Sequence, residues 1–350
     1  MNSMERVLGA IQGTPVDRRP VALTLSLYGA RLSQCPLKEY YTNPQRYLDG
    51  QLAVLEQCRP DVLFTPFALT AEAEAFGSER VFFDKGPPNI KKPAVGCAAD
   101  FIKIPLPDID SNQSLLYLRE ATRLLAASAK GTVPVAAITL NPVDLPAIVM
   151  GIDNWLETLL FDELATRLVL DKACAFFIAW ANALLTDGAN FIALPSMFTN
   201  PRIITKKIVE KTILPAVRAA FAEIKGPIVF HHGGNRLQEF MPLYTTLPNV
   251  AAFVIDSRDH FSEIRKHTGP ERVLMGNING PNLWRLKPEQ VKELCEKILT
   301  ERQDDPHFIL ATSDADIAYD TPLENITAIT DTVAAFKGRK EGRKDDDTSH

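Results

Sequence analysis

The chain has 350 residues and a formal net charge of −5 at pH 7. Proteins that bind nucleic acid usually carry a basic face, so this charge balance gives no reason to expect a nucleic-acid partner. Hydrophobic residues make up 46% of the chain and charged residues 23%, the composition of an ordinary globular protein. The length alone allows one large domain or two small ones.

We expect a cytoplasmic protein with no membrane partner. No apolar run reaches the roughly 20 residues of a membrane span. The first residues, MNSMERVLGAIQG, lack the basic-then-apolar layout of a secretion signal. The cysteines are never spaced as Cys-x-x-Cys, which favours reduced thiols over a disulfide framework or a structural zinc site. They are Cys35, Cys58, Cys97, Cys174 and Cys295.

Short apolar runs alternate along the chain with stretches of helical spacing. The runs are nearly continuous in apolar residues, as expected for strands that are buried on both faces. The predicted strands are 20–26, 61–67, 133–140, 191–196, 227–231, 250–256, 273–277 and 307–313.

Helix signals lie between these runs. Asn43 followed by Pro44 predicts a helix start, and Pro288 predicts another. The stretch 155–185 is long enough for two helices or for one helix with a turn. Strands that alternate with helices in this number predict a single (β/α)8 barrel, here over residues 1–336. The charged tail 337–350 has nothing apolar to bury and is expected to be disordered.

A doubly wound open sheet is the alternative fold. Such sheets normally carry a glycine-rich first turn, and the Gly-x-Gly-x-x-Gly pattern is absent from this sequence. In a (β/α)8 barrel the chemistry lies where the strands end, so polar residues at the strand ends are the candidates for a functional site.

The segment HHGGN at 231–235 ends the fifth predicted strand. Side chains alternate along a strand, so one of its two histidines can face the barrel mouth, and we predict that it is His231. His232 would then pack between strand and helix or contact the site from the loop. The glycines let the backbone approach a ligand closely. A structural turn around a hydrogen-bonded histidine is the alternative.

Carboxylates follow two further strands. Asp256 ends the sixth predicted strand, and Asp314 and Asp316 follow the eighth. Together with a histidine they could hold a divalent metal, orient a polar substrate or act as acid and base. We predict catalytic roles for His231, Asp256 and Asp314. Helix capping is the alternative, and we expect it for Asp320, because Thr-Pro follows it.

Further polar or aromatic residues end the remaining strands. Asn277 ends the seventh, where barrel loops often bind an anion, although a plain turn is equally open. Asn141, Tyr28 and Phe67 stand near the ends of the third, first and second strands. We predict that these four residues and His232 line the substrate site.

Several stretches, in this order, resemble the uroporphyrinogen decarboxylase superfamily and more closely its corrinoid-dependent methyltransferase branch. They are MERVLGAIQGTPVDRRPV near the start, NPVDLPAIVMG at 141–151, VFHHGGN at 229–235, VLMGNING at 273–280 and DIAYDTPLENI at 316–326. The resemblance covers residues 3–336 and implies a (β/α)8 barrel, in agreement with the strand count.

The chain departs from the members that decarboxylate uroporphyrinogen. Those resemble one another in an Arg-Gln-Ala-Gly-Arg segment of the first strand and in an Asp after the second. Here the two places read LSLYGAR and TPFAL, so Arg31 alone could match. A site for a substrate with many carboxylates needs several Arg or Lys residues at its mouth. We therefore reject porphyrinogen decarboxylation.

The resemblance also bears on metal binding. Coenzyme M methyltransferases of the family hold zinc with a His-x-Cys pair after strand five and a Cys after strand eight. His231 matches the histidine, whereas the cysteine positions fall on Gly233 and Ala315. In the branch that demethylates methoxylated aromatics, the spacing of the zinc ligands matches Glu210 and His231, but its further glutamate falls on Pro195. A zinc ion is therefore expected, if one is bound, on His231 and Glu210 together with Asp256 or Asp314.

The resemblance implies an enzyme that moves a methyl group between a small substrate, here a methoxylated compound, and the cobalt of a separate corrinoid-binding protein. Cobalt(I) is a strong nucleophile, so the chain would mainly position the reactants. A metal on His231 and Glu210, or a protonated His231 alone, would assist the leaving oxygen. Asp256 would orient the histidine or the substrate, and Tyr28 and Phe67 would flank an aromatic ring. A barrel that binds a tetrapyrrole or corrinoid without catalysis is one alternative, and a small-molecule decarboxylase or demethylase is another. A homodimer is left open.

Overall fold

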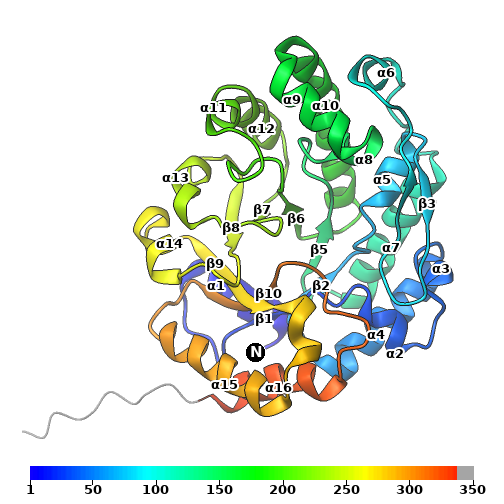
Figure 1. Ribbon diagram of the computed structural model, residues 1–350. Coiled ribbons are helices and arrows are strands. Elements are labelled where there is room, and N and C mark those ends of the chain that lie inside the picture. Colours follow the sequence, from blue (N-terminus) through cyan, green and yellow to red (C-terminus); the bar gives the residue numbers. More distant parts are fainter. Residues whose placement is uncertain (337–350) are drawn as a thin grey trace, which may run out of the picture.

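The computed structural model describes residues 1–336, and it forms a barrel of parallel strands (Figure 1). All eight predicted strands are present, so the predicted fold class is confirmed. The barrel strands are β1 (Val21–Ala22), β2 (Leu63–Phe64), β5 (Val135–Ile138), β6 (Phe191–Pro195), β7 (Ile228–His231), β8 (Val250–Val254), β9 (Val273–Asn279) and β10 (Phe308–Ser313).

Hydrogen bonding runs around the barrel in the order β1-β10-β9-β8-β7-β6-β5-β2, with every pair parallel. The remaining seam lies between β1 and β2. It is bridged just before β2, where the backbone N–H of Asp61 donates to the carbonyl of Val21 over 2.7 Å. Parallel strands need long return connections, and helices provide them on the outside of the ring.

The helices surround the strands, as the ribbon shows (Figure 1). They are α1 (Ser3–Gln12), α2 (Tyr28–Leu32), α3 (Leu37–Tyr40), α4 (Pro44–Cys58), α5 (Thr70–Ala75), α6 (Ala98–Lys103), α7 (Gln113–Ala129), α8 (Leu145–Val149), α9 (Ile152–Phe161), α10 (Glu163–Thr186), α11 (Lys206–Ile208), α12 (Leu214–Ala222), α13 (Met241–Tyr244), α14 (Phe261–Thr268), α15 (Pro288–Glu301) and α16 (Leu323–Ala335). Short η segments are Val209–Ile213, Gln238–Phe240 and Gly280–Arg285.

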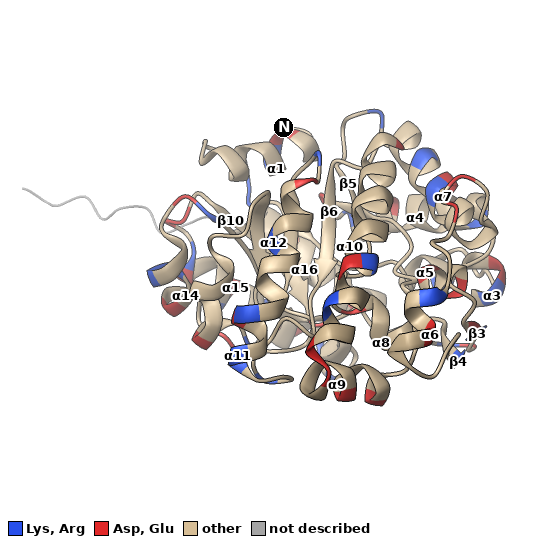
Figure 2. Ribbon diagram, turned by 90° about the horizontal axis from the view of Figure 1, so that it is seen from above, with Lys and Arg blue, Asp and Glu red and all other residues tan. Residues whose placement is uncertain are grey.

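Two hydrophobic cores follow from the alternation of side chains along each strand. On β7, Ile228 and Phe230 point outward into the core shared with the helices, and Val229 points into the barrel. The barrel core also contains Val7 and Ala10 of α1. Helix α1 therefore closes the end of the barrel at which the strands begin, and it lies opposite α6 and α9 in Figure 2. The other end, at which the strands finish, is left open as a mouth.

Some details differ from the sequence prediction. The stretch 155–185 lies in two helices, α9 and α10, and Asp162 caps the second by accepting from the N–H of Ala165. A hairpin of β3 (Glu79–Val81) and β4 (Asn89–Lys92) was not predicted, because only three of its seven residues are apolar or partly buried. Its connecting loop reaches the barrel mouth. The predicted disordered tail, 337–350, lies outside the described residues.

Helix α10 has the length and the apolar composition of a membrane span. It is the one helix of residues 1–336 that is long and apolar enough to cross a membrane by length and composition. Half of that apolar window is buried inside the fold, as in a core helix.

Asp61 joins the parts of the chain that meet at the closed end. Its fully buried carboxylate accepts from Arg18 at 2.5 Å and from the backbone N–H of Val21 at 2.9 Å. It also accepts from the hydroxyl of Ser3 at 2.8 Å and lies 3.3 Å from Arg6. One buried carboxylate thus ties α1, β1 and the start of β2 together across the barrel seam.

We predict that Asp61→Asn lowers the free energy of unfolding by about 2 kcal/mol, because it leaves two partly buried arginines, Arg6 and Arg18, without their counter-charge. Urea denaturation monitored by circular dichroism would measure the loss. Asp331→Asn is the matched control, since Asp331 forms an ion pair with Arg59 in which both side chains are more than half exposed. Equal effects of the two substitutions would contradict the assigned role of Asp61.

Candidate active site

Two connected cavities open at the mouth of the barrel. The inner cavity runs down the barrel axis and is walled by inward-facing side chains of the strands, among them Ala193, Val229, His231 and Ala311. The outer cavity is much wider and lies under the loops that follow the strands. Phe67, Pro195 and Ala315 line both cavities, so they form the neck between them.

His231 lies on the wall of the inner cavity. Val229 points into the barrel, so the residue two positions later on the same strand does so as well. Its ring nitrogen Nδ1 accepts the backbone N–H of Gly233 over 3.0 Å. That bond places the ring proton on Nε2. No hydrogen bond from Nε2 to another of residues 1–336 is present.

His231 is neutral in this environment. Burial, with a smaller contribution from the neighbouring His232, holds the pKa of His231 well below its usual value of 6.5. The two imidazole rings stack with their centroids 4.3 Å apart, so a positive charge on one would be repelled by a charge on the other. At neutral pH, His231 therefore offers a hydrogen-bond donor rather than an acidic imidazolium.

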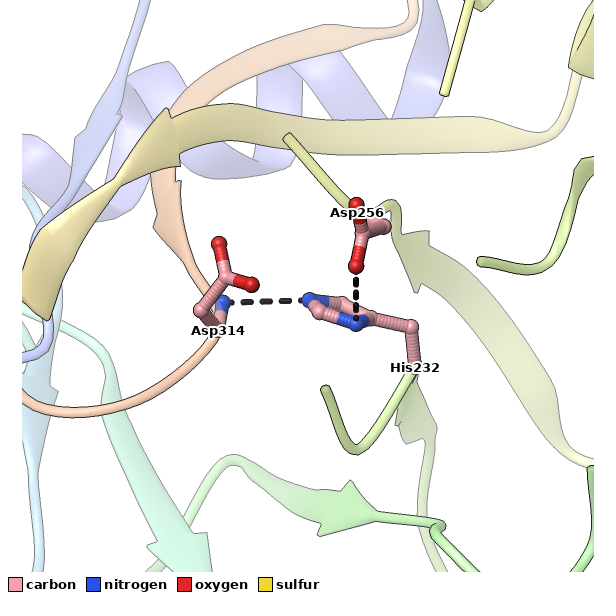
Figure 3. A group of neighbouring side chains, drawn as sticks. All are labelled: His232, Asp256 and Asp314. Carbon is pink, nitrogen blue, oxygen red and sulfur yellow. Dashed lines mark hydrogen bonds and ion pairs between the residues drawn. The ribbon is translucent and has the colours of Figure 1, made fainter. Parts of the chain in front are cut away.

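His232 forms a second group with Asp256 and Asp314 (Figure 3). Its Nε2 accepts the backbone N–H of Asp314 over 3.0 Å. Its Nδ1 lies 3.4 Å from the carboxylate of Asp256 and 3.1 Å from the N–H of Gly234. Burial lowers the pKa of His232, while the charges of Asp256 and Asp314 oppose that shift. The ring thus joins the ends of β7, β8 and β10.

Asp314 adopts an unusual backbone conformation. Its φ of 75° lies in the left-handed region, which costs a non-glycine residue free energy. The N–H bond to His232 holds it there, and the carboxylate accepts from the hydroxyl of Ser313 over 3.0 Å. This conformation places Asp314 in the wall of the outer cavity.

The group of His232, Asp256 and Asp314 does not fit a bound metal ion in this arrangement. One candidate ligand atom from each residue lies within 4.8 Å of the others. However, each nitrogen of His232 faces a backbone N–H, and the Asp256 carboxylate accepts from Arg258 through Nε and Nη2, both at 2.6 Å. The Arg258 guanidinium also contributes to holding the pKa of Asp256 below its usual value, against the effect of burial. On His232 and Asp256 the electron pairs that a cation would need are thus engaged, whereas the Asp314 carboxylate accepts only from the hydroxyl of Ser313.

Glu210, which was predicted to hold zinc together with His231, lines neither of the two cavities. Glu210 lies in the irregular segment before α12, with a half-exposed side chain that is 3.6 Å from Lys206. Its spacing from His231 in the sequence has no counterpart in space, because the intervening chain passes through a helix on the outside of the barrel.

The structure also shows why position 233 has no room for the cysteine of a thiol-type zinc site. His231, Gly233 and Ala315 do meet at the neck and the outer cavity. Gly233 has a φ of 62°, and a Cβ built on it would lie 2.7 Å from the backbone N of Met197 and 2.7 Å from the carbonyl carbon of Ser196. The loop after β6 therefore occupies the space in which a cysteine side chain would begin.

Two predicted substrate contacts are structural residues instead. Tyr28 is fully buried, its hydroxyl donates to the carbonyl of Thr321 over 2.9 Å, and burial raises its pKa to about 12. Asn141 is also fully buried and joins two strand ends by donating to the hydroxyl of Ser196 over 3.0 Å. Neither lines either cavity. Both satisfy buried backbone or hydroxyl groups, a role that residues at strand ends also fill.

Of the other predicted residues, Phe67 lines the cavities, whereas Asn277 and Asp320 do not. Phe67 lies in the neck, where a substrate ring could meet it. Asn277 donates to the carbonyls of Asp256 and Asp259 and so fixes the loop after β8, without lining a cavity. Asp320 is not a helix cap, because it forms an exposed ion pair with Lys85, and Pro322 precedes the first residue of α16.

Arg31 does not face a ligand either. Its guanidinium donates to the carbonyls of Tyr319 and Thr321, at 2.8 and 2.6 Å. The arginine that could have matched the decarboxylating members is therefore used to hold the loop after β10. This observation supports the rejection of porphyrinogen decarboxylation.

Two buried carboxyl groups lie at the mouth. Asp316 was among the predicted carboxylates, whereas Asp144 was missed. Asp144 accepts from the N–H groups of Met197 and Phe198, at 2.9 and 2.7 Å, and burial raises its pKa to about 7. Asp316 accepts from the N–H of Ser26 over 2.9 Å, and burial raises its pKa to about 8. Both hold loops against one another across the mouth. Their position at strand ends was the only available sequence signal.

Comparisons with known proteins agree with this geometry. The family model described as uroporphyrinogen decarboxylase matches residues 2–336. The methylcobamide:CoM methyltransferase MtbA of Methanosarcina mazei is 28% identical over 308 residues, covering 84% of this chain and 88% of that protein. The uroporphyrinogen decarboxylase of Edwardsiella ictaluri is 22% identical over 250 residues, covering 68% of each chain.

A solved structure with the same fold is a methyltransferase from Methanosarcina mazei. It superposes with a TM-score of 0.84 and covers 95% of this chain and 98% of that one. The identity is 19%, so this likeness concerns the fold.

We predict that Gly233→Ala is more destabilising than Gly234→Ala. Both glycines have positive φ, so both substitutions introduce backbone strain of about 1 to 2 kcal/mol. A Cβ at 234 meets nothing within 4 Å, whereas a Cβ at 233 meets backbone at 2.7 Å. The additional loss at 233 should be about 2 kcal/mol in chemical denaturation. Equal losses of unfolding free energy in the two variants would show that the loop after β6 can move aside at little cost.

A second prediction concerns pH. The unfolded chain binds a proton at His231 below about pH 6.5, whereas the folded chain, with its lowered pKa, does not. The stabilisation due to neutral His231 is therefore complete above pH 6.5 and is lost as the pH falls. The difference in unfolding free energy between wild type and His231→Gln should be about 1 kcal/mol smaller at pH 5.5 than at pH 8.

The control for this pH prediction is His267→Gln, at an exposed position on α14. Its difference from wild type should be the same at both pH values. A constant difference for His231→Gln as well would mean that folding does not lower the pKa of His231.

Proposed function

The chain belongs to the uroporphyrinogen decarboxylase family, and we propose that it moves a methyl group between a methoxylated compound and the cobalt of a separate corrinoid protein. Family membership agrees with the resemblance of the motifs. The relatives named methyltransferases support methyl transfer, and the engaged Arg31 speaks against a decarboxylase for substrates rich in carboxylates. We further propose that the enzyme works in the cytoplasm.

The observation that carries this proposal is the position of His231 at the junction of two cavities. Its Nε2 is free of partners among the described residues and lies in the wall of a nearly apolar cavity. A small ether can place its oxygen beside Nε2 at the neck. The methyl group then points through the neck towards the outer cavity. The reacting carbon is thereby presented to a partner that docks over the mouth.

The residues of this chain assist the leaving oxygen. As the bond between methyl carbon and oxygen breaks, negative charge develops on the oxygen. The Nε2–H of His231 donates to that oxygen and stabilises the charge, most strongly where water is excluded. The N–H of Gly233 holds the ring in the required tautomer through Nδ1. His231 needs no positive charge for this role, in agreement with its lowered pKa.

The group of His232, Asp256 and Asp314 acts as a positioning element in this proposal. His232 stacks on His231 and is held from three sides by Asp256, Gly234 and the backbone of Asp314. Its rigidity fixes the plane in which the His231 ring can lie. The residues do not fit zinc, so no step of the proposed reaction uses a metal.

The outer cavity is the expected docking place for the corrinoid. It is wide and largely apolar, and residues from the β3–β4 loop, α8 and the loop after β10 line it, among them Pro87, Ile148 and Tyr319. A large flat macrocycle can cover such an opening and exclude water from the neck. The small side chain of Ala315 leaves the neck open between the two reactants.

We predict that His231→Ala lowers kcat for transfer of a methyl group from a methoxylated donor to cob(I)alamin by about 10² to 10³, because a preorganised donor to the leaving oxygen is lost. His231→Gln, which retains an N–H donor near the Nε2 position, should recover part of that loss. Methylcobalamin formation, followed by its absorbance, is the measurement.

Two observations would contradict the proposal. Unchanged methyl transfer in His231→Ala would remove the assigned role of the histidine. A full equivalent of zinc in purified protein, with activity lost on chelation, would contradict the metal-free mechanism. Tight binding of cobalamin with no transfer from any donor would favour the alternative of a non-catalytic corrinoid-binding barrel.

A further inference from the structure

A groove lies on the outer surface at the corner between α9 and α10. Its volume is about 590 Å³. One wall contains Leu160, Phe161 and Thr166 at this corner, and the facing wall contains Ile208 and Thr212 of the segment from α11 to α12. Both α9 and α11 lie at the end of the barrel opposite α1 (Figure 2). None of the residues that line the groove lines either cavity at the mouth, so the groove is a separate feature of the surface.

The corner itself forms an apolar knob, made of Phe161 and Leu164. Phe161, the last residue of α9, is 82% exposed, and Leu164, in the first turn of α10, is 70% exposed. The chain bends between them at Asp162, whose carboxylate caps α10. Contact of large apolar side chains with water is unfavourable, so the knob gains free energy when another surface covers it.

Charges of opposite sign lie on the two sides of the groove. Asp153 and Glu157 precede Phe161 by two turns and one turn of α9, and both are exposed. Lys207 and Lys211 line the facing wall and are exposed as well. None of these four charged side chains forms an ion pair or a hydrogen bond with another of residues 1–336. Their charges are therefore available to a partner.

We propose that this corner is the interface of a homodimer, in which each copy of the chain places its knob in the groove of the other. Asp153 and Glu157 of each copy then face Lys207 and Lys211 of the other. This interface goes beyond the proposed methyl transfer and does not depend on it.

The self-complementary layout of the corner identifies the partner as a second copy. The knob lies directly beside the groove, because Phe161 also lines the groove wall. The acidic side chains accompany the knob and the basic ones the groove. A two-fold axis close to Phe161 therefore forms every contact twice, as in an isologous interface. The two Phe161 rings meet near that axis, where an aromatic pair is favourable.

The first test is the mass of the full chain in solution. Size-exclusion chromatography with light scattering should give the mass of two chains, each of 38.8 kDa, at micromolar concentration. Phe161→Ser should raise the dissociation constant of the dimer at least tenfold, because the side chain at the centre of the interface is lost. Phe83→Ser is the matched control and should leave the dimer unchanged. Phe83 is 48% exposed in the loop between β3 and β4 and does not line the groove.

The second test reverses the charges in two separate variants. One carries Asp153→Lys and Glu157→Lys, and the other carries Lys207→Glu and Lys211→Glu. In each variant alone, like charges face one another in both halves of the interface, so each should be monomeric where the wild type is dimeric. An equimolar mixture should restore the mass of a dimer, because unlike charges then meet in both halves. All four positions are exposed, so the substitutions should leave the fold intact.

Three results would overturn the inference. A wild-type chain that is monomeric at these concentrations has no such interface. A dimer that Phe161→Ser does not weaken uses another face of the molecule. A mixture of the charge-reversed variants that stays monomeric rules out the assigned pairing, even if Phe161→Ser does not fold. A monomeric wild type that sediments with phosphatidylglycerol vesicles would assign the corner to a membrane surface instead.

Discussion

The close approach of two backbone segments at Gly233 determines much of this active site. The turn after β7 lies against the loop after β6, so near that a Cβ at 233 would be 2.7 Å from backbone atoms. Asp144 holds that loop in place by accepting two of its N–H groups. With the turn fixed, the N–H of Gly233 reaches Nδ1 of His231, and the opposite side of the ring is presented to the cavity.

Carboxyl groups in this barrel mainly hold loops in place by accepting hydrogen bonds from their backbone N–H groups. Asp61 joins the segments at the closed end, Asp316 holds the start of α2, and Asp259 accepts from the backbone N–H groups of Leu237 and Gln238 after β7. Burial raises the pKa of Asp144 to about 7 and that of Asp316 to about 8, so they can be neutral at the pH at which they hold these loops. The polar residues around the mouth are thus largely committed to structure, and the inner cavity is left to apolar contacts and one histidine.

The fold was predictable because its signals are local and repeated. Continuous apolar runs mark parallel strands, and helix caps such as Asn43 mark the returns between them. The candidate site was only partly predictable. The assignment of His231 to the inward side followed from alternation along β7, and the cavity wall contains it. Tyr28, Asn141 and Asn277 stand at strand ends as well, but their side chains satisfy buried partners, which strand position alone does not reveal.

The sequence by itself determined the barrel, the order of its strands and the location of the mouth, because these depend on periodicity and on residue type. It also determined that the cysteines of a thiol-type zinc site are missing at Gly233 and Ala315. Only the tertiary structure decided that Glu210 lies on the outer surface, that Arg258 engages Asp256 and that backbone N–H groups face both nitrogens of His232. Those contacts join elements far apart in the chain, and their formation depends on how loops of different lengths pack over the mouth. No local pattern in the sequence encodes that packing.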